Sequence, residues 1–327
     1  MLERWILNAW YGKAKWTRLL LPIMWLYSLV VGRKRREYLN QPPSPVLKPV
    51  IVVGNITAGG TGKTPVVQAL VRAFAGKGYK AAIITRGYGG DLDKYPHMVT
   101  QSDSPKAVGD EPYMMYQTLD VPIVVDPNRR QAAKYCCQNL SDQIDLIISD
   151  DGLQHYQLHR DIEICVMDAA RGIGNGQLIP VGPLREPLER LDAVDVVLRN
   201  GVQADDGFVL EPTRWVNLLT GESEAISSFD PGDSVKAIAG IGNPWRFFKT
   251  LAKLNISATE QAYPDHHKYS AEDVEGYSGT LLMTEKDAVK IKPFATNNMW
   301  YLEVSAVLPE ALICQLLTRL KRLSGDS

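Results

Sequence analysis

A glycine-rich turn followed by lysine and threonine carries the most recognisable chemistry in the sequence. The run Gly59-Gly60-Thr61-Gly62-Lys63-Thr64 lies between an apolar stretch, Val50–Val53, and a helix-like stretch, Pro65–Phe74. In this order of strand, turn and helix, backbone N–H groups converge on phosphate oxygens and the positive end of the helix dipole supports them. We expect Lys63 to reach the β- and γ-phosphates of a nucleotide and the Thr64 hydroxyl to hold Mg²⁺.

The glycine pattern departs from the strict form of this motif, which has a glycine five residues before Gly62. That position is Thr57, with Gly54 and Gly59 nearby. The alternative is a glycine-rich turn that binds nothing, but the spacing, the Lys-Thr pair and the flanking elements favour phosphate binding. The expected nucleotide-binding residues are consecutive: Thr57, Ala58, Gly59, Gly60, Thr61, Gly62, Lys63 and Thr64.

Two pairs of acids could serve the same phosphates. Asp150 and Asp151 end an apolar run, which is how a Walker B aspartate is presented to Mg²⁺. Asp110 and Glu111 precede the helix-like stretch Tyr113–Thr118. An acid at a helix start is often a cap, but it could also accept a proton from an attacking hydroxyl while its neighbour holds metal. The residue types alone leave these alternatives open.

Arginine, tyrosine and histidine side chains in loops could bind a phosphorylated or sugar substrate. Such residues occur in the stretches Thr85–Gly90 and Gly182–Pro187, and the alternative for each is a solvated loop. His155 and His159 are four residues apart, but no third ligand has the spacing of a zinc site. The pair Asp265-His266 lies in another loop, where residue type alone favours an inert histidine.

Apolar runs that alternate with helix-like stretches must position these residues. Their pattern predicts an α/β fold with a parallel, doubly wound sheet, whose ligands lie at the carboxyl ends of the strands. The polar stretch 203–233 is expected to link this sheet to a second, smaller α/β domain. The expected domains are an N-terminal helix, a P-loop core and the smaller domain, at 1–36, 37–215 and 216–327. The strands expected in the core after the P-loop are 81–85, 121–125, 145–149, 162–167 and 194–198.

The composition is that of an ordinary globular protein. Of 327 residues, 45% are hydrophobic and 22% charged, and the net charge of −1 gives no global field for nucleic acid. The four cysteines show no metal spacing, which indicates reduced packing residues.

The N-terminus is the exception to this neutral composition. The first 36 residues contain eight Lys or Arg and one acid, around an apolar run at 19–32. Fourteen helical residues span about 21 Å, which is short of the roughly 30 Å of a bilayer core. Four tryptophans and basic clusters at both ends predict a helix that lies in the membrane surface. The alternative is a helix buried against the protein's own core.

Taken together, these motifs resemble the tetraacyldisaccharide 4'-kinase family, the lipid A 4'-kinases of Gram-negative bacteria. The resemblance covers most of the chain, and several stretches in one order are more specific than the P-loop alone. Besides the N-terminal helix it rests on these stretches: 54–65, 85–88, 109–112, 126–129, 150–155, 182–186, 265–266 and 284–287.

The resemblance implies transfer of the γ-phosphoryl group of ATP, with Mg²⁺, to the 4'-hydroxyl of a tetraacylated, already phosphorylated glucosamine disaccharide. It implies Asp110 as the base, assisted by His266, with Lys63 at the transferred phosphate. Together with the Thr64 of the P-loop, it implies Glu111, Asp150 and Asp151 as the residues close to the metal. It implies that the positions facing the disaccharide are Arg86, Tyr88, Gln154, His155, Arg185 and Glu186.

Because the acyl chains of such a substrate would stay in the bilayer, the expected location is the cytoplasmic face of the inner membrane, as a peripheral or monotopic protein. The expected partners are the lipid disaccharide and an anionic membrane surface, with no nucleic acid and no evident protein partner. The competing hypothesis is a membrane-recruited P-loop ATPase that switches or sorts partners. It is disfavoured because Ala58 stands where such ATPases have a signature lysine.

Overall fold

A computed structural model describes residues 2–12 and 14–324 of the chain. Within them the strands form a 13-stranded sheet, in the order β11-β10-β12-β13-β8-β7-β6-β1-β5-β2-β4-β3, with β9 paired to β8. The strands are β1 Val50–Gly54, β2 Ala81–Thr85, β3 His97–Met98, β4 Ile123–Val125, β5 Leu146–Asp150, β6 Ile162–Asp168, β7 Val196–Asn200, β8 Gly207–Asn217, β9 Ser223–Ala225, β10 Val235–Ala239, β11 Thr259–Ala262, β12 Thr280–Thr284 and β13 Met299–Val307.

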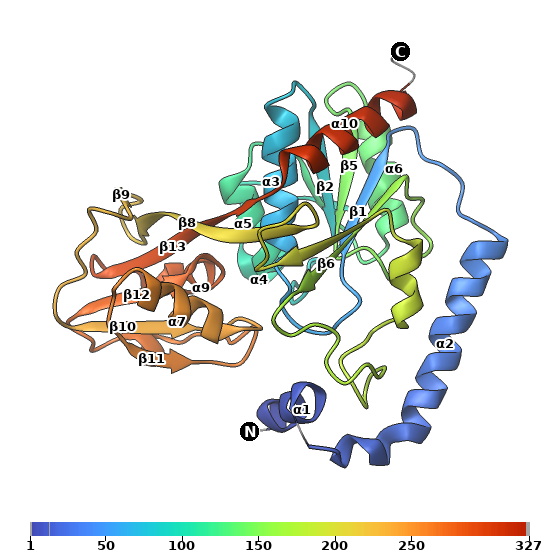
Figure 1. The fold of residues 1–327 in the computed structure, drawn as a ribbon. Coiled ribbons are helices and arrows are strands. Elements are labelled where there is room, and N and C mark those ends of the chain that lie inside the picture. Colours follow the sequence, from blue (N-terminus) through green and yellow to red (C-terminus); the bar gives the residue numbers. More distant parts are fainter. Residues whose placement is uncertain (1, 13, 325–327) are drawn as a thin grey trace.

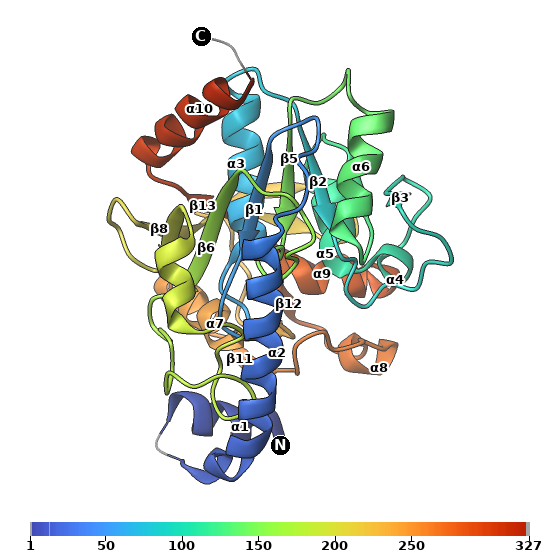
Figure 2. The same cartoon turned by 90° about the vertical axis from the view of Figure 1, so that its right-hand side faces the viewer.

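Helices cover both faces of this sheet and extend from it at the N-terminus (Figures 1 and 2). The α-helices are α1 Leu2–Tyr11, α2 Leu21–Asn40, α3 Lys63–Ala75, α4 Pro105–Val108, α5 Asp110–Thr118, α6 Arg129–Asn139, α7 Pro244–Lys253, α8 Ala271–Val274, α9 Glu285–Ile291 and α10 Glu310–Ser324. Short 3-10 helices are η1 Trp16–Leu20, η2 Leu188–Ala193 and η3 Lys292–Phe294.

Apart from the short edge strand β3, which is antiparallel to β4, the first half of the sheet is parallel and doubly wound, as the alternating pattern predicted. β1 lies at its centre and pairs in parallel with β5 and β6. Side chains of a strand alternate between faces, so Ile51 and Val53 pack in the cluster under α3 and α10, whereas Val50 and Val52 pack with α6 on the other face. Every residue of β1 is buried. The carboxyl ends of β1, β2 and β5 therefore meet at one edge of the sheet.

The stretch expected to link the two domains, residues 203–233, contains β8 and β9, two strands that its sequence did not indicate. β8 pairs in parallel with β7 and antiparallel with β13, and it carries the fully buried Trp215. Its polar composition concealed it because strand formation depends on pairing and packing more than on intrinsic preference. The other strands and helices expected after residue 50 are present, with ends shifted by no more than a few residues. The N-terminal region, expected to form one helix, instead contains α1, η1 and α2.

β8 and β13 join the P-loop core to a smaller lobe, which holds β10–β12, α7 and α9 on the left of Figure 1. After β13 the chain returns, and α10 packs Leu312, Ile313 and Leu316 into the core cluster under the first sheet half. The expected boundary after residue 215 falls inside β8. The division of the chain into separate domains stays a prediction.

The N-terminal segment lies along the side of the core, with α2 almost separate from it (Figure 1). No residue of α2 is buried. It is held by the Tyr27 hydroxyl, which donates to the Arg185 carbonyl oxygen at 2.8 Å, and by Tyr38, whose ring is 5.3 Å from that of Tyr156. Among the described residues, no helix combines the length and the apolar character needed to cross a bilayer.

Candidate active site

The glycine-rich turn connects β1 to α3 and has the geometry of a P-loop. Gly62 takes a φ of 97°, which favours glycine, and an added Cβ would lie 2.4 Å from the Asn200 side-chain nitrogen. Two asparagines hold the turn. The Asn200 Nδ2 donates to the Thr61 carbonyl at 2.9 Å, and the Asn55 Nδ2 donates to the Thr57 carbonyl at 2.7 Å. These two hydrogen bonds fix the conformation of the turn that leads into the N-terminus of α3.

The P-loop opens into a cavity of about 900 Å³ between the core and the smaller lobe. Gly242, just before α7, packs against Gly60 of the P-loop, and Trp245 in the first turn of α7 also lines the cavity. The cavity lining includes these expected site residues: Gly59, Gly60, Thr61, Gly62, Lys63, Thr64, Arg86, Tyr88, Glu111, Asp150, Asp151, Gln154, His155, Arg185 and His266. A nucleotide on the P-loop would therefore lie among most of the residues that the sequence singled out.

Asp150 and Asp151 follow each other at the end of β5 but have different environments. Asp151 lies 3.3 Å from the Lys63 Nζ and 3.2 Å from an Arg185 nitrogen. Burial alone would raise the pKa of Asp151, but Lys63 and Arg185 lower it overall to about 2. The Asp150 pKa is instead raised, first by burial and then by the charges of Glu111 and Asp151. Its Oδ1 is buried and has no hydrogen-bond partner among the described residues.

These acids fit a magnesium ion held together with phosphates. Within the described residues, no group of three or more His, Cys, Asp or Glu is arranged to hold a metal. Mg²⁺ at phosphates usually takes one or two protein carboxylates and completes its shell with phosphate oxygens and water. The unpartnered Asp150 oxygen meets that requirement, since a buried carboxylate needs a cation or a donor. Glu111 has a different partner, the Lys286 Nζ at 3.0 Å.

Asp110 begins α5 and faces the smaller lobe. Gly109 precedes it with a φ of 97°, and a Cβ there would lie 2.8 Å from the Tyr88 carbonyl oxygen, so the two loops can pack backbone to backbone. The Asp110 Oδ2 lies 3.7 Å from the His266 Nδ1, and the His266 ring lies 4.9 Å from that of Tyr88. The core thus brings Asp110 and Tyr88 to the same histidine.

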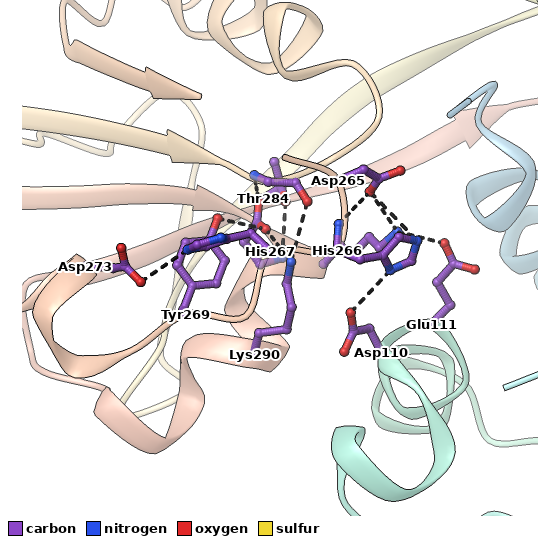
Figure 3. A network of polar contacts seen from close by, with 12 residues as sticks. Asp110, Glu111, Asp265, His266, His267, Tyr269, Asp273, Thr284 and Lys290 are labelled. Atoms are coloured by element: carbon purple, nitrogen blue, oxygen red, sulfur yellow. Dashed lines mark hydrogen bonds and ion pairs between the residues drawn. The ribbon is translucent and has the colours of Figure 1, made fainter. Parts of the chain in front are cut away.

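His266 and its neighbour His267 point to different partners, as Figure 3 shows. The His267 Nε2 lies 3.2 Å from Asp273 and its ring stacks on Tyr263, both within the smaller lobe. His266 has a φ of 57°, an uncommon value for a non-glycine residue that is frequent at functional sites. Its backbone conformation directs the side chain across to Asp110.

The loop residues expected at the substrate divide into two groups. Arg86, Tyr88, Gln154, His155 and Arg185 line the cavity, whereas Glu186 is completely buried. Glu186 accepts a hydrogen bond of 2.8 Å from the Gln154 side chain and another from the Tyr156 hydroxyl. It therefore lies behind the cavity wall and orients Gln154. Burial, with a contribution from Arg129, lowers the pKa of His155 to about 4 and keeps its ring neutral.

Three residues of the site have structural roles that residue types did not indicate: Asn55, Asn200 and Lys286. Asn55 and Asn200 hold the P-loop by hydrogen bonds to its backbone carbonyls, and no spacing in the sequence predicts such contacts. Lys286 lies within the stretch 284–287 that supported the family resemblance, but the resemblance gave it no role. Burial alone would lower the pKa of Lys286, whereas Glu111 and Asp265 raise it above its usual range, so the side chain stays charged.

Comparison with known proteins agrees with this geometry. The profile of the family described as tetraacyldisaccharide-1-P 4'-kinase matches residues 16–321, which is most of the chain. The chain belongs to this kinase family. The family resemblance seen in the motifs is thereby confirmed.

Relatives of the kinase extend over its whole length. A tetraacyldisaccharide 4'-kinase of Hahella chejuensis is 44% identical, over 98% of this chain and 97% of the relative. One of Pseudomonas fluorescens is 46% identical, over 97% and 96%. The crystal structure of LpxK from Aquifex aeolicus, in complex with ATP, superimposes with a TM-score of 0.75 at 26% identity, over 93% of this chain and 99% of that one. This likeness confirms the expected P-loop α/β fold.

Proposed function

We propose that this kinase transfers the γ-phosphoryl group of ATP to the 4'-hydroxyl of a tetraacyldisaccharide 1-phosphate, giving the 1,4'-bisphosphate of lipid A biosynthesis. The observation that carries the proposal is that one cavity is lined by the P-loop Lys63 and by His266, whose Nδ1 lies 3.7 Å from the Asp110 carboxylate. A phosphate-binding turn alone would also suit an ATPase. A carboxylate opposite that turn supports a kinase, because a sugar hydroxyl needs a base.

Each residue of this pair has a defined task in the proposed reaction. The Asp110 carboxylate accepts the proton of the attacking hydroxyl, and His266, 3.7 Å away, orients it. The separation exceeds a hydrogen bond, as is common before substrate aligns the groups. Lys63 supplies positive charge to the transferred phosphoryl group, and the P-loop amides hold the remaining phosphates.

The metal expected in this reaction has residues that would hold it. Asp150, with its unpartnered oxygen, is the first of them, together with Asp151 and Thr64 of the same cavity. When bound with nucleotide, Mg²⁺ neutralises phosphate charge. Glu111 would join this set only by giving up its contact with Lys286.

The disaccharide would lie on the wall formed by Arg86, Tyr88, Gln154, His155 and Arg185. Arginine binds phosphate by two parallel hydrogen bonds, which suits a sugar phosphate. Arg185 already pairs with Asp151, so its guanidinium has a fixed position before substrate arrives. Glu186 contributes from behind, by holding Gln154.

The acyl chains of the substrate require a membrane surface, which we propose that η1 and α2 contact at the cytoplasmic face of the inner membrane. Large apolar side chains are exposed there, with Leu19 84%, Trp25 73% and Leu26 65% accessible. The cluster Arg33-Lys34-Arg35-Arg36 continues the same helix and suits anionic lipid headgroups. Buried helices do not leave such residues in solvent, which disfavours the alternative of a core helix.

Labelled ATP tests this function against the competing ATPase. The purified chain is incubated with γ-labelled ATP and tetraacyldisaccharide 1-phosphate, and the products are separated by organic extraction. A kinase places the label in the organic phase, and Lys63→Ala should lower that label by about 10²–10³-fold, because it removes charge aimed at the transition state. Release of free phosphate without labelled lipid would support the ATPase instead.

A further inference from the structure

Lys286 lies at the contact between the P-loop core and the smaller lobe. Its Nζ is 3.0 Å from the Glu111 Oε1 of the core. The same atom is 3.5 Å from the Asp265 Oδ1 and 3.5 Å from the His266 Nε2 of its own lobe. Only 16% of the side chain is accessible. One ammonium group thus joins a core acid to both members of the Asp265-His266 pair.

The position of Lys286 is fixed by the helix that carries it. Lys286 is in the first turn of α9, and the Thr284 side chain caps that turn by accepting from the Asp287 backbone. Asp287 is completely buried and accepts from the Gly240 N–H at 3.0 Å and the Tyr269 hydroxyl at 3.1 Å. This network, part of which is drawn in Figure 3, anchors the start of α9 to the lobe.

A buried lysine in the first turn of a helix is unfavourable unless other residues compensate for its charge. The N-terminal turn of a helix carries partial positive charge, so a cation there is disfavoured. Burial of the ammonium adds a second unfavourable contribution. Glu111 and Asp265 compensate for both, and Glu111 belongs to the other half of the molecule. The arrangement is therefore suited to fixing how the two halves meet.

The two acids that Lys286 contacts are the chain neighbours of the proposed acid–base pair. Asp110 is followed by Glu111, and His266 is preceded by Asp265. The Asp110 and His266 side chains themselves are 3.7 Å apart, too far for a hydrogen bond to hold them. Lys286 is the shorter connection between these two segments.

We propose that Lys286 is a positioning residue for the phosphoryl transfer, which sets His266 against Asp110 by tying Glu111 to Asp265. This inference rests on the proposed function. Its distinctive consequence is that Lys286 acts through Asp110. A small misplacement of a catalytic group is enough to lower turnover by about 10²-fold.

A double-mutant cycle with Asp110 tests this dependence. Lys286→Met keeps the length of the side chain and removes its charge. In the wild-type background it should lower kcat about 10- to 100-fold and change the KM for ATP by only a few-fold. In the Asp110→Asn background the same change should cost less than about threefold, because the base it positions is already lost. Lys286→Arg should recover part of the activity.

Two control variants separate positioning from general effects on the lobe. Arg214 of β8 forms a 2.8 Å ion pair with Glu303 of the paired strand β13, so Arg214→Met should keep full activity. Arg246 of α7 reaches across to Asp168 of the core at 2.7 Å, away from Asp110. Arg246→Met loosens the two halves without touching the acid–base pair, so its cost should be the same with and without Asp110→Asn.

Three results would overturn the inference. The losses from Lys286→Met and Asp110→Asn could multiply, which means that Lys286 acts independently. The KM for ATP could rise strongly while kcat is unchanged, which assigns Lys286 to phosphate binding. Arg246→Met could show the same dependence on Asp110, which assigns the effect to lobe closure in general. A wild-type protein that does not label the lipid at all contradicts the proposed function itself, and is thus distinguishable from each of these.

Discussion

Asp110 and Glu111 are consecutive residues with separate partners. Asp110 faces His266, whereas Glu111 is bound by Lys286. A helix turns about 100° per residue, so adjacent side chains at its start point in different directions. A proton acceptor needs a free lone pair and a position near substrate, which suits Asp110. Glu111, neutralised by an ammonium, is better suited to holding the two lobes in register.

Replacement of the proposed base separates chemistry from binding. Asp110→Asn keeps the size of the side chain and removes its basicity, so kcat should fall by about 10²–10⁴-fold while the affinity for ATP stays within a few-fold of wild type. Nucleotide affinity and lipid phosphorylation are measured on the same preparation. Loss of ATP binding with chemistry preserved would make Asp110 a cap or a metal ligand.

Glu285, next to Lys286, makes stability depend on pH. Burial, and then the nearby Glu303, raise the pKa of Glu285 from 4.5 to about 7. The folded state therefore keeps its proton where the unfolded state loses it. The stabilisation is fully present below about pH 4.5 and is lost as the pH rises to about 7, to an extent of up to about 3 kcal/mol.

The variant Glu285→Gln should remove this dependence. It stays neutral at every pH, so the free energy of unfolding at pH 8 should exceed that of wild type, and the difference should shrink toward pH 5. Urea unfolding at both pH values measures it, with the slope of ΔG against denaturant as a check that the unfolded states are comparable. An unchanged pH slope would mean that Glu285 is not protonated in the folded protein.

At the scale of elements, motif and period predicted most of the site. The strand β1, the glycine turn and α3 follow from Val50–Val53 and Gly59–Thr64, since few sequences combine that order with Lys-Thr. The position of Asp150 at the end of β5 follows from the sequence, because Asp150 ends the apolar run that forms this strand. β8 could not be predicted, because its polar residues form a strand only when β7 and β13 provide partners.

The contacts between the two lobes could not be predicted from the sequence either. Lys286 is 175 residues from Glu111, and no local pattern reports so distant a pair. The same holds for Asn200, which holds the Thr61 carbonyl from 139 residues away. The buried position of Glu186 depends on Tyr156 and Gln154 folding over it. Such facts come from tertiary packing, which neither spacing nor composition specifies.

The exposed face of α2 gives a prediction at the same scale. Trp25 and Leu29 are 73% and 59% accessible, so Trp25→Gln with Leu29→Gln should leave the fold intact. Affinity for vesicles that contain anionic lipid should fall about tenfold or more, because two large apolar groups no longer enter the interface. Flotation with vesicles measures it at low and high salt.

The matched control for the α2 variant is Leu219→Gln, a similar change at a residue that is 49% accessible in the smaller lobe. It should bind vesicles like wild type. If the α2 variant binds as well as this control, a different surface faces the membrane.

At the scale of the whole molecule, β8 and β13 join two lobes (Figure 1). Residues of both lobes line the cavity. The P-loop lies on one side, α7 on the other, and the Asp110–His266 contact crosses between lobes. The N-terminal helices η1 and α2 form the proposed membrane-contacting surface. The Tyr27 hydroxyl connects α2 to the backbone of Arg185. In the proposed function, the molecule thereby combines a nucleotide site with access to a substrate that stays in the bilayer.

The most direct test of this account is the position of the new phosphate on the sugar. The purified chain is supplied with ATP, Mg²⁺ and tetraacyldisaccharide 1-phosphate, and the lipid product is examined by phosphorus–proton correlation NMR. We predict a second phosphate coupled to the proton at C4', at one equivalent per disaccharide, and its absence with Lys63→Ala. A phosphate at another hydroxyl, or an unchanged lipid beside hydrolysed ATP, would contradict the account.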